Sequence, residues 1–311
     1  MPFVNTLEIL KDAKKNKYAV GAFNVFSLDH AAAIIRLCDS LGSPVLITEP
    51  AVLEPYLCFK DLGSLTKNIA SQVSVPVGLH LSHGSDIATI KRVIDAGFTS
   101  AMIDGSSLSF EENIRLTKEA AVLAHKSGVT IEGELGAVGN TAGSIASSMT
   151  DPVLAKKYVS ETGIDILAVS IGNSHGFYKG TPKLDFQRFE DIKNQFKDNS
   201  NLYFTLHGGT GIADSDLARL IANEMTKICI YTEMCGAGKD KAMDYLARHP
   251  NYGGTKDVPE LFKSIAAGFL SIVEHDINVF GSCHKSALTG AAISASELEK
   301  IVRQVISNIK L

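Results

Sequence analysis

The sequence has no tryptophan, and its five cysteines include no CxxC pair. An odd, scattered set of cysteines argues against a disulfide framework and favours a reduced, cytoplasmic setting. Like charges never form a block of five and the net charge is only −4, so the sequence indicates no nucleic-acid or membrane-surface partner. It also lacks an apolar run long enough to cross a bilayer, and its first residues lack the uninterrupted apolar core of a secretory signal.

What is present is a recurring pattern of strands and helices. Most of the short apolar runs are followed by a segment of helical period, and nearly all-apolar strands separated by helices indicate a parallel sheet covered on both faces. The eight runs are 19–25, 44–50, 75–83, 100–106, 129–136, 166–172, 202–209 and 227–233. Eight such units predict an α/β fold, the (β/α)8 TIM barrel, with a doubly wound open sheet as the alternative.

No proline- or serine-rich linker divides the chain, so residues 1–311 are expected to form a single barrel domain. Two helical segments fall outside the eightfold pattern. The first, near residues 6–17, is placed to plug the bottom of the barrel. The second, about residues 257–311, predicts a C-terminal extension of two helices whose apolar faces exceed what one barrel needs. We therefore expect this extension to pack between subunits of a homodimer or homotetramer.

Polar side chains gather at the predicted carboxyl ends of the strands, where barrel enzymes carry their chemistry. Among them His83, His175 and His207 lie at or just beyond the ends of different strands and would form a three-nitrogen site with an open position, the pattern of a catalytic zinc. Glu134, on the neighbouring strand, is an alternative ligand or a partner of the ligands. Taken singly, each histidine would more often be a hydrogen-bonded core or rim residue than a ligand, but the convergence of three predicts a metal site.

The other histidines have less distinctive positions. His80 is three residues from His83, so it should point to the opposite face of its strand unless the chain bulges there. The remaining four fall in predicted helices and are expected at the surface: His30, His125, His249 and His275.

A glycine-rich run, "HGGTG" at 207–211, ends the seventh strand and opens a helix. Its backbone amides are placed to cradle a phosphate, because the loops after strands seven and eight form the usual phosphate site of such barrels. Lys179 lies on the loop after "SHGFY" and suits an anion. The predicted substrate- and phosphate-binding residues are Asn24, Gly176, Lys179, Gly208, Gly209, Thr210 and Thr232.

No lysine stands at the predicted carboxyl end of a strand, where a Schiff-base enzyme would need one. Lys227 begins the eighth strand, which places it at the opposite rim. A carbon–carbon lyase built on this sequence should therefore use metal rather than imine chemistry.

Six segments together resemble the class II (zinc-dependent) fructose-bisphosphate and tagatose-bisphosphate aldolases: "AVGAFNV", "VPVGLHLSHG", "SAMIDGSSLSFEENIRLTKEA", "IEGELGAVG", "IGNSHGFYKG" and "LHGGTGI". They run in family order from about residue 18 to residue 233. The resemblance implies a dimeric or tetrameric barrel lyase that handles dihydroxyacetone phosphate. It implies zinc on His83, His175 and His207, with Glu134 near the metal. It also implies phosphate or monovalent-cation contacts at Gly176, Lys179, Gly208, Thr210 and Thr232.

The resemblance breaks at the residues that handle protons. Ser82 stands where the family has its aspartate base, and a serine hydroxyl has no comparable basicity near neutral pH. The loop after "ELG" reads "AVGNTAGSIASS", without the family's glutamate that exchanges a proton at the enediolate carbon. On the eighth strand "CIYT" replaces Asn-Ile-Asp-Thr, so Cys229 and Tyr231 stand in place of asparagine and aspartate. The candidate catalytic residues are thus Ser82, Tyr231 and Asp104.

Three hypotheses are compatible with these departures. The first is a zinc aldolase for a different ketose phosphate, in which water, Tyr231, His80 or Asp104 transfers the proton. The second is another zinc-dependent enediolate reaction, an epimerisation or isomerisation. The third is a catalytically silent protein that binds a sugar phosphate. The loss of one general base typically removes 10²–10⁴-fold of the rate, which favours the first hypothesis.

Overall fold

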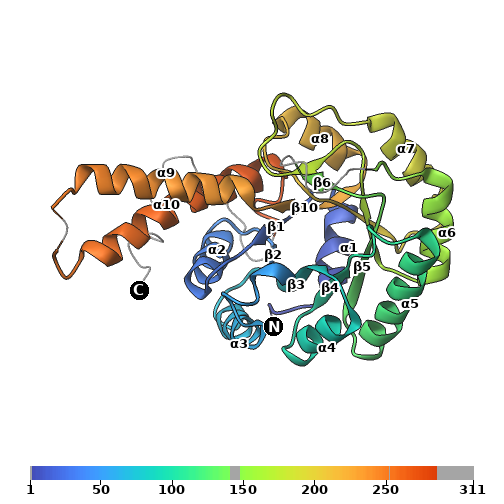
Figure 1. The fold of residues 1–311 in the computed structure, drawn as a ribbon, viewed down its shortest axis with the longest axis horizontal. Helices are drawn as coiled ribbons and strands as arrows, with labels where there is room; N and C mark the ends of the chain where they lie inside the picture. The colour runs from blue at the N-terminus through green and yellow to red at the C-terminus, as the bar shows by residue number, and fades with distance from the viewer. Residues whose placement is uncertain (1, 141–147, 252, 286–311) are drawn as a thin grey trace.

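The structure is a computed structural model that describes residues 2–140, 148–251 and 253–285. Eight parallel strands close into a barrel in the order β1-β10-β9-β7-β5-β4-β3-β2 (Figure 1). They are β1 (Val20–Asn24), β2 (Val45–Pro50), β3 (Val77–Gly84), β4 (Ser100–Ile103), β5 (Thr130–Leu135), β7 (Ile166–Val169), β9 (Tyr203–Leu206) and β10 (Met225–Ile230). Every strand predicted from the sequence is present, and the TIM barrel is confirmed. The doubly wound open sheet is excluded because β1 pairs with both β2 and β10.

Helices cover the outside of the barrel and are positioned by caps that the sequence contains. The Asp86 side chain accepts from the backbone N–H of Thr89, and Ser109 and Glu112 form a capping box. The barrel helices are α2 (Leu28–Ser40), α3 (Phe59–Ala70), α4 (Ile87–Asp95), α5 (Phe110–Lys126), α6 (Pro152–Thr162), α7 (Phe186–Asn194) and α8 (Asp214–Ala222), while α9 (Thr232–Arg248) follows β10 and leads away from the barrel (Figure 1). A 3-10 turn, η1 (Ala51–Leu53), follows β2, and β6 (Gly139–Asn140) pairs with β8 (Ser174–His175) above the barrel.

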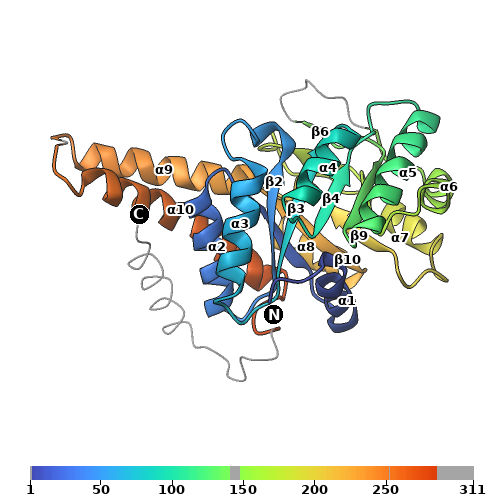
Figure 2. The ribbon, with the colours of Figure 1, turned by 90° about the horizontal axis from the view of Figure 1, so that it is seen from below.

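Helix α1 (Thr6–Asn16) closes the amino-terminal end of the barrel, as predicted (Figure 2). Its apolar face, which includes Ile9, Leu10 and Ala13, packs with side chains inside the barrel such as Leu46 and Ile166. Because α1 closes the amino-terminal end, the open mouth of the barrel lies at the carboxyl ends of the strands. None of the helices in the described part of the chain is both long and apolar enough to cross a membrane.

The hairpin of α9 and α10 (Asp257–Val279) projects from the side of the barrel, and we call it the arm (Figures 1 and 2). Helix α10 is the first of the two helices expected in the tail. The second, near residues 294–310, lies outside the described residues. The arm exposes large apolar side chains on both helices: Met243, Leu246, Val258 and Phe262.

Strand β3 contains an irregularity that bears directly on the mouth. Leu81 pairs with Ala101 and Gly84 pairs with Ile103, so β3 has one residue more than β4 in this stretch. The extra residue is a bulge, and His83 takes a left-handed conformation there with φ +52. Regular alternation would turn His80 and His83 to opposite faces, but the bulge brings both rings inside the barrel.

Two expectations from the sequence are wrong. His30 was expected at the surface, but it is only 1% exposed, because α10 places Phe269 against it on one side while Phe26 covers the other. Lys227 does not lie at the rim. It is fully buried inside the barrel, because β10 begins two residues earlier than expected.

Candidate active site

Three histidine rings converge at the mouth of the barrel, from the ends of β3, β8 and β9. The ring centroids of His83 and His175 are 5.0 Å apart, those of His83 and His207 4.6 Å, and those of His175 and His207 6.1 Å. One nitrogen from each ring lies within 4.8 Å of the others. The structure therefore brings together the three histidines that the sequence singled out.

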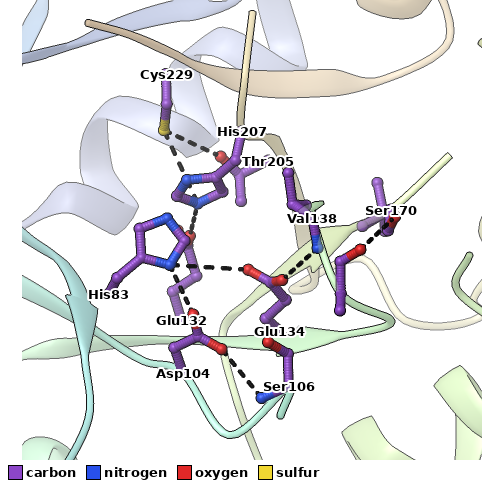
Figure 3. Close-up of polar contacts among 12 residues, drawn as sticks. His83, Asp104, Ser106, Glu132, Glu134, Val138, Ser170, Thr205, His207 and Cys229 are labelled. Carbon is purple, nitrogen blue, oxygen red and sulfur yellow. Dashed lines mark hydrogen bonds and ion pairs between the residues drawn. The ribbon is translucent and has the colours of Figure 1, made fainter. Parts of the chain in front are cut away.

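One ring nitrogen of His83 contacts a carboxylate, and the other has no hydrogen-bond partner. Its Nδ1 lies 2.7 Å from Oδ2 of Asp104, and the backbone N–H of Ser106 fixes the other Asp104 oxygen at 3.0 Å (Figure 3). Its Nε2 is buried and has no hydrogen-bond partner. A carboxylate behind a histidine whose second nitrogen is unpartnered is the usual arrangement around a metal ligand, so this residue fits a divalent ion.

His207 is held in the same way from inside the barrel. Its Nε2 lies 2.7 Å from Oε1 of Glu132, which leaves Nδ1 as the nitrogen available to an ion (Figure 3). Glu132 in turn accepts from Nζ of Lys227 at 2.6 Å. The same Nζ contacts Nε2 of His80 at 2.9 Å, and the Nδ1 of His80 reaches Ser100 at 2.8 Å. We call His80, Lys227 and Glu132 the interior network.

Burial keeps two of the three rings in the form that binds metals. Desolvation lowers the pKa of His83 below its ordinary value, although the hydrogen bond to Asp104 opposes the shift. Desolvation and the neighbouring rings lower the pKa of His175 to about 3. Both imidazoles are therefore neutral at neutral pH, as ligation requires. Burial also lowers the pKa of His207, but its contacts with Cys229 and Glu132 raise it above the ordinary value.

Glu134 lies beside the three rings, and only one of its two carboxylate oxygens has a hydrogen-bond partner. Its Oε1 accepts from the backbone N–H of Val138 at 2.9 Å, while Oε2 has no partner and lies 4.0 Å from Nδ1 of His83. Burial, followed by repulsion from Asp104, raises the pKa of Glu134 to about 8. His83, Asp104 and Glu134 form a second group with ligand spacing, so an alternative role for Glu134 as a ligand fits the geometry.

A cavity of about 530 Å³ opens above the histidines. Most of the residues predicted for the site line it: Asn24, His83, Asp104, His175, Gly176, His207, Gly208, Thr210, Tyr231 and Thr232. Four others do not, namely Ser82, Glu134, Lys179 and Gly209. Ser82 is buried and its Oγ has no partner, whereas Lys179 is exposed.

The glycine loop after β9 is shaped by close backbone contacts. Gly208 has φ +65, and a Cβ at this position would lie 2.3 Å from the carbonyl oxygen of Ser174. Asn173 donates to the carbonyl oxygen of His207 at 2.9 Å, which fixes the strand end beside the loop. Only glycine fits at position 208. Because there is no side chain at this position, the backbone of the loop lies close to the cavity.

Some residues of the site were not assigned roles from the sequence. Lys227 was placed at the rim and given no role, and its contact with His80 could not be foreseen because the two residues lie 147 positions apart in the chain. Val52 and Leu53, which line the cavity from η1, were not predicted either. Their apolar character resembles that of any strand end.

Comparison with known proteins agrees with this geometry. Residues 4–285 match the family model described as fructose-bisphosphate aldolase class-II. A fructose-bisphosphate aldolase of Geobacillus stearothermophilus is 38% identical over 257 residues, which cover 81% of this chain and 88% of that protein.

Solved structures show the same fold. The crystal structure of the YdjI aldolase from Escherichia coli K12 superposes with a TM-score of 0.79 at 30% identity, covering 91% of this chain and 99% of that one. Fructose-bisphosphate aldolase from Campylobacter jejuni superposes with a TM-score of 0.78 at 22% identity, covering 91% and 96%, which is a likeness of fold alone.

Proposed function

We propose, from the premise that this chain belongs to the class II fructose-bisphosphate aldolase family of lyases, that it cleaves and forms a ketose phosphate with zinc held by His83, His175 and His207. Dihydroxyacetone phosphate or a related ketone is the donor. The observation that carries the proposal is the convergence of three rings, two of them backed by carboxylates. When bound, zinc supplies Lewis-acid polarisation of a carbonyl oxygen, worth several kcal/mol.

The residues around the rings orient them for this role. Asp104 holds the Nδ1 of His83 and leaves its Nε2 as the nitrogen that would bind an ion, while Glu132 holds the Nε2 of His207 and leaves its Nδ1 for the same role. Burial would raise the pKa of Asp104, but the contact with His83 holds it well below the ordinary value. Asp104 is therefore an ionised orienting group rather than the proton acceptor.

The loops after β8, β9 and β10 are proposed to bind the phosphate and any accompanying monovalent cation. Gly176 and Gly208 line the cavity with left-handed backbone, at φ +94 and +65. Thr232 lies at the N-terminus of α9, where backbone N–H groups and the helix dipole favour an anion. Asn24 and Thr210 line the same cavity, and exposed Lys179 and buried Gly209 belong to the same loops.

Tyr231 is the proposed proton donor to the aldehyde oxygen during carbon–carbon bond formation. It lines the cavity, and burial and Cys235 raise its pKa well above the ordinary value, so the phenol keeps its proton until substrate oxygen takes it. Ser82, which we place at the family's aspartate position, is buried and is not among the residues that line the cavity. Tyr231→Phe should therefore lower kcat by about 10²–10⁴-fold, whereas Ser82→Ala should change it less than about threefold. Equal losses in both variants would contradict this assignment.

Metal analysis and product analysis together test the function. Protein loaded with zinc should release a triose from ketose phosphates, and a chelator should abolish the release. His175→Ala should lose both the zinc and the activity, while His275→Ala, at an exposed position on α10, should keep both. Exchange of a substrate hydrogen with solvent deuterium without any change in carbon count would establish an epimerase or isomerase instead. Binding with neither product nor exchange would establish a silent sugar-phosphate-binding protein.

The arm is proposed to pair copies of the chain into a dimer or tetramer. It projects from the barrel and exposes Met243, Val258 and Phe262, each about half exposed or more. Burial of such side chains between subunits is favourable at about 25 cal/mol per Å². The molar mass of the purified protein in solution tests this proposal, and a monomeric mass would refute it.

A further inference from the structure

The cavity above the histidines has two chemically different sides. One side is formed by the glycine and threonine loops after β8, β9 and β10, to which the proposed function assigns the phosphate. The other is formed by residues after β2, β3 and β4, and we call it the far wall. It consists of Pro50, Val52, Leu53, Ser85, Ser106 and Ser107.

The topology of the barrel sets these two sides against each other. In the closed ring β2 lies four strands from β7 in either direction, so the residues after β2 face the loops that follow β7. The three histidines lie between the two sides, because His83 is near the carboxyl end of β3 while His175 and His207 follow β7 and β9. A substrate held by its phosphate on one side and by its carbonyl at the histidines must therefore extend its remaining carbons toward the far wall.

The far wall offers carbon and hydroxyl groups. Val52 and Leu53 stand on η1, and Val52 is 76% exposed, so its side chain is open to whatever enters the cavity. Among the described residues that line the cavity there is neither lysine nor arginine. Arg92, on the neighbouring α4, is paired with Glu54 and stacked over Phe59 at 5.4 Å.

A phosphate group would be poorly accommodated at such a wall. A dianion placed against Val52 and Leu53 loses hydration, and the described lining supplies no cation to replace it. Asp104 lines the same cavity, with its carboxyl group 2.7 Å from His83, and it too offers no positive charge to a phosphate. Aliphatic carbon, by contrast, gains by contact with Val52 and Leu53, and the serines can satisfy a hydroxyl.

We propose that the far wall binds the aldehyde half of the substrate and selects a short, neutral aldehyde, so that the preferred ketose is a 1-phosphate rather than a bisphosphate. The inference rests on the proposed aldolase function and names its substrate class. In cleavage the C3–C4 bond of the ketose breaks, its electron pair stays on C3, and C3 then takes a proton. The C4 hydroxyl gives up its proton as C4 becomes the aldehyde carbon, which leaves dihydroxyacetone phosphate and the neutral aldehyde.

Competition between aldehydes tests the inference. Zinc-loaded protein and dihydroxyacetone phosphate are combined with D-glyceraldehyde 3-phosphate, D-glyceraldehyde or lactaldehyde, and kcat/KM is measured for each aldehyde. The neutral aldehydes should exceed the phosphorylated one by tenfold or more. An equal or higher value for glyceraldehyde 3-phosphate would overturn the inference and leave the aldolase function intact. Absence of product from all three aldehydes would overturn the aldolase function, and with it the inference.

A charge added to the far wall sharpens the test. Val52→Lys should raise kcat/KM for glyceraldehyde 3-phosphate about tenfold relative to glyceraldehyde, and the gain should shrink at high salt. Val122→Lys, at an exposed position on the outer face of α5, is the matched control and should leave the ratio unchanged. An unchanged ratio in Val52→Lys would show that the wall does not meet the aldehyde, and would overturn the inference.

Discussion

The mouth of the barrel and the interior network beneath it both combine histidine with carboxylate side chains, but they differ in whether their buried polar atoms have hydrogen-bond partners. In the network, Nζ of Lys227 lies between His80 and Glu132, and each has its hydrogen-bond partners. At the mouth, Nε2 of His83 and Oε2 of Glu134 are buried and have none. Buried polar atoms are nearly always paired, so the unpartnered atoms at the mouth indicate a site where an ion or ligand binds.

An unpartnered atom alone would not be decisive. In the described residues, His30 has two buried nitrogens without partners and Glu49 two such oxygens, yet neither belongs to a group of three or more side chains with metal-ligand spacing. What distinguishes the mouth is convergence together with carboxylates behind the rings. The interior network supplies one of those carboxylates and so links the two regions.

The largest expected effect comes from removing the cation of the network. Lys227→Met leaves the Glu132 charge buried and less compensated, which should lower the free energy of unfolding by about 3–5 kcal/mol. Urea unfolding measures the loss, with Lys118→Met at the exposed face of α5 as control. The double variant Lys227→Met/Glu132→Gln should recover part of it. A loss below about 1 kcal/mol in Lys227→Met would show that the network does not depend on this pair.

A smaller effect should follow at the residue that the two regions share. In Glu132→Gln the amide N–H₂ can donate to Nε2 of His207, which would shift the ring proton to Nδ1, the nitrogen left available to an ion. Zinc affinity, measured by competition with a chelating dye, should then fall about 10–100-fold. Glu161→Gln, whose carboxylate lies in an exposed pair with Lys157, should leave the affinity unchanged. Unaltered zinc affinity in Glu132→Gln would show that the interior network does not influence metal binding at the mouth.

The smallest effect concerns a buried histidine that belongs to neither region. Burial lowers the pKa of His30 to about 3, so the unfolded chain binds a proton near pH 6.5 that the folded chain does not. The contribution of His30 to stability therefore falls as the pH drops below 6.5. His30→Leu should remove about 2 kcal/mol of this loss between pH 7 and pH 5, measured by urea unfolding at both values. His275→Leu, at an exposed site, should behave like the parent, and identical pH dependence in His30→Leu would contradict the assignment.

The barrel could be predicted because its signals are local. Each strand is a short apolar run, and each helix start carries its own cap, as at Asp86 and Ser109. The three histidines could be predicted because parallel strands bring their carboxyl ends together. The interior network could not, because Lys227 meets a histidine 147 positions away. His30 was misplaced for the same reason, since its cover comes from Phe269 on the distant α10.

The bulge in β3 also restricts which residues can be substituted without disturbing the active site. Gly84 carries no functional group, yet a methyl group there would lie 2.8 Å from both the Leu81 side chain and the carbonyl oxygen of Met102. Even alanine would push the two strands apart next to the left-handed turn at His83. The reactivity of the barrel thus depends on an empty space the size of one carbon atom, at a residue that a search for reactive groups would pass over.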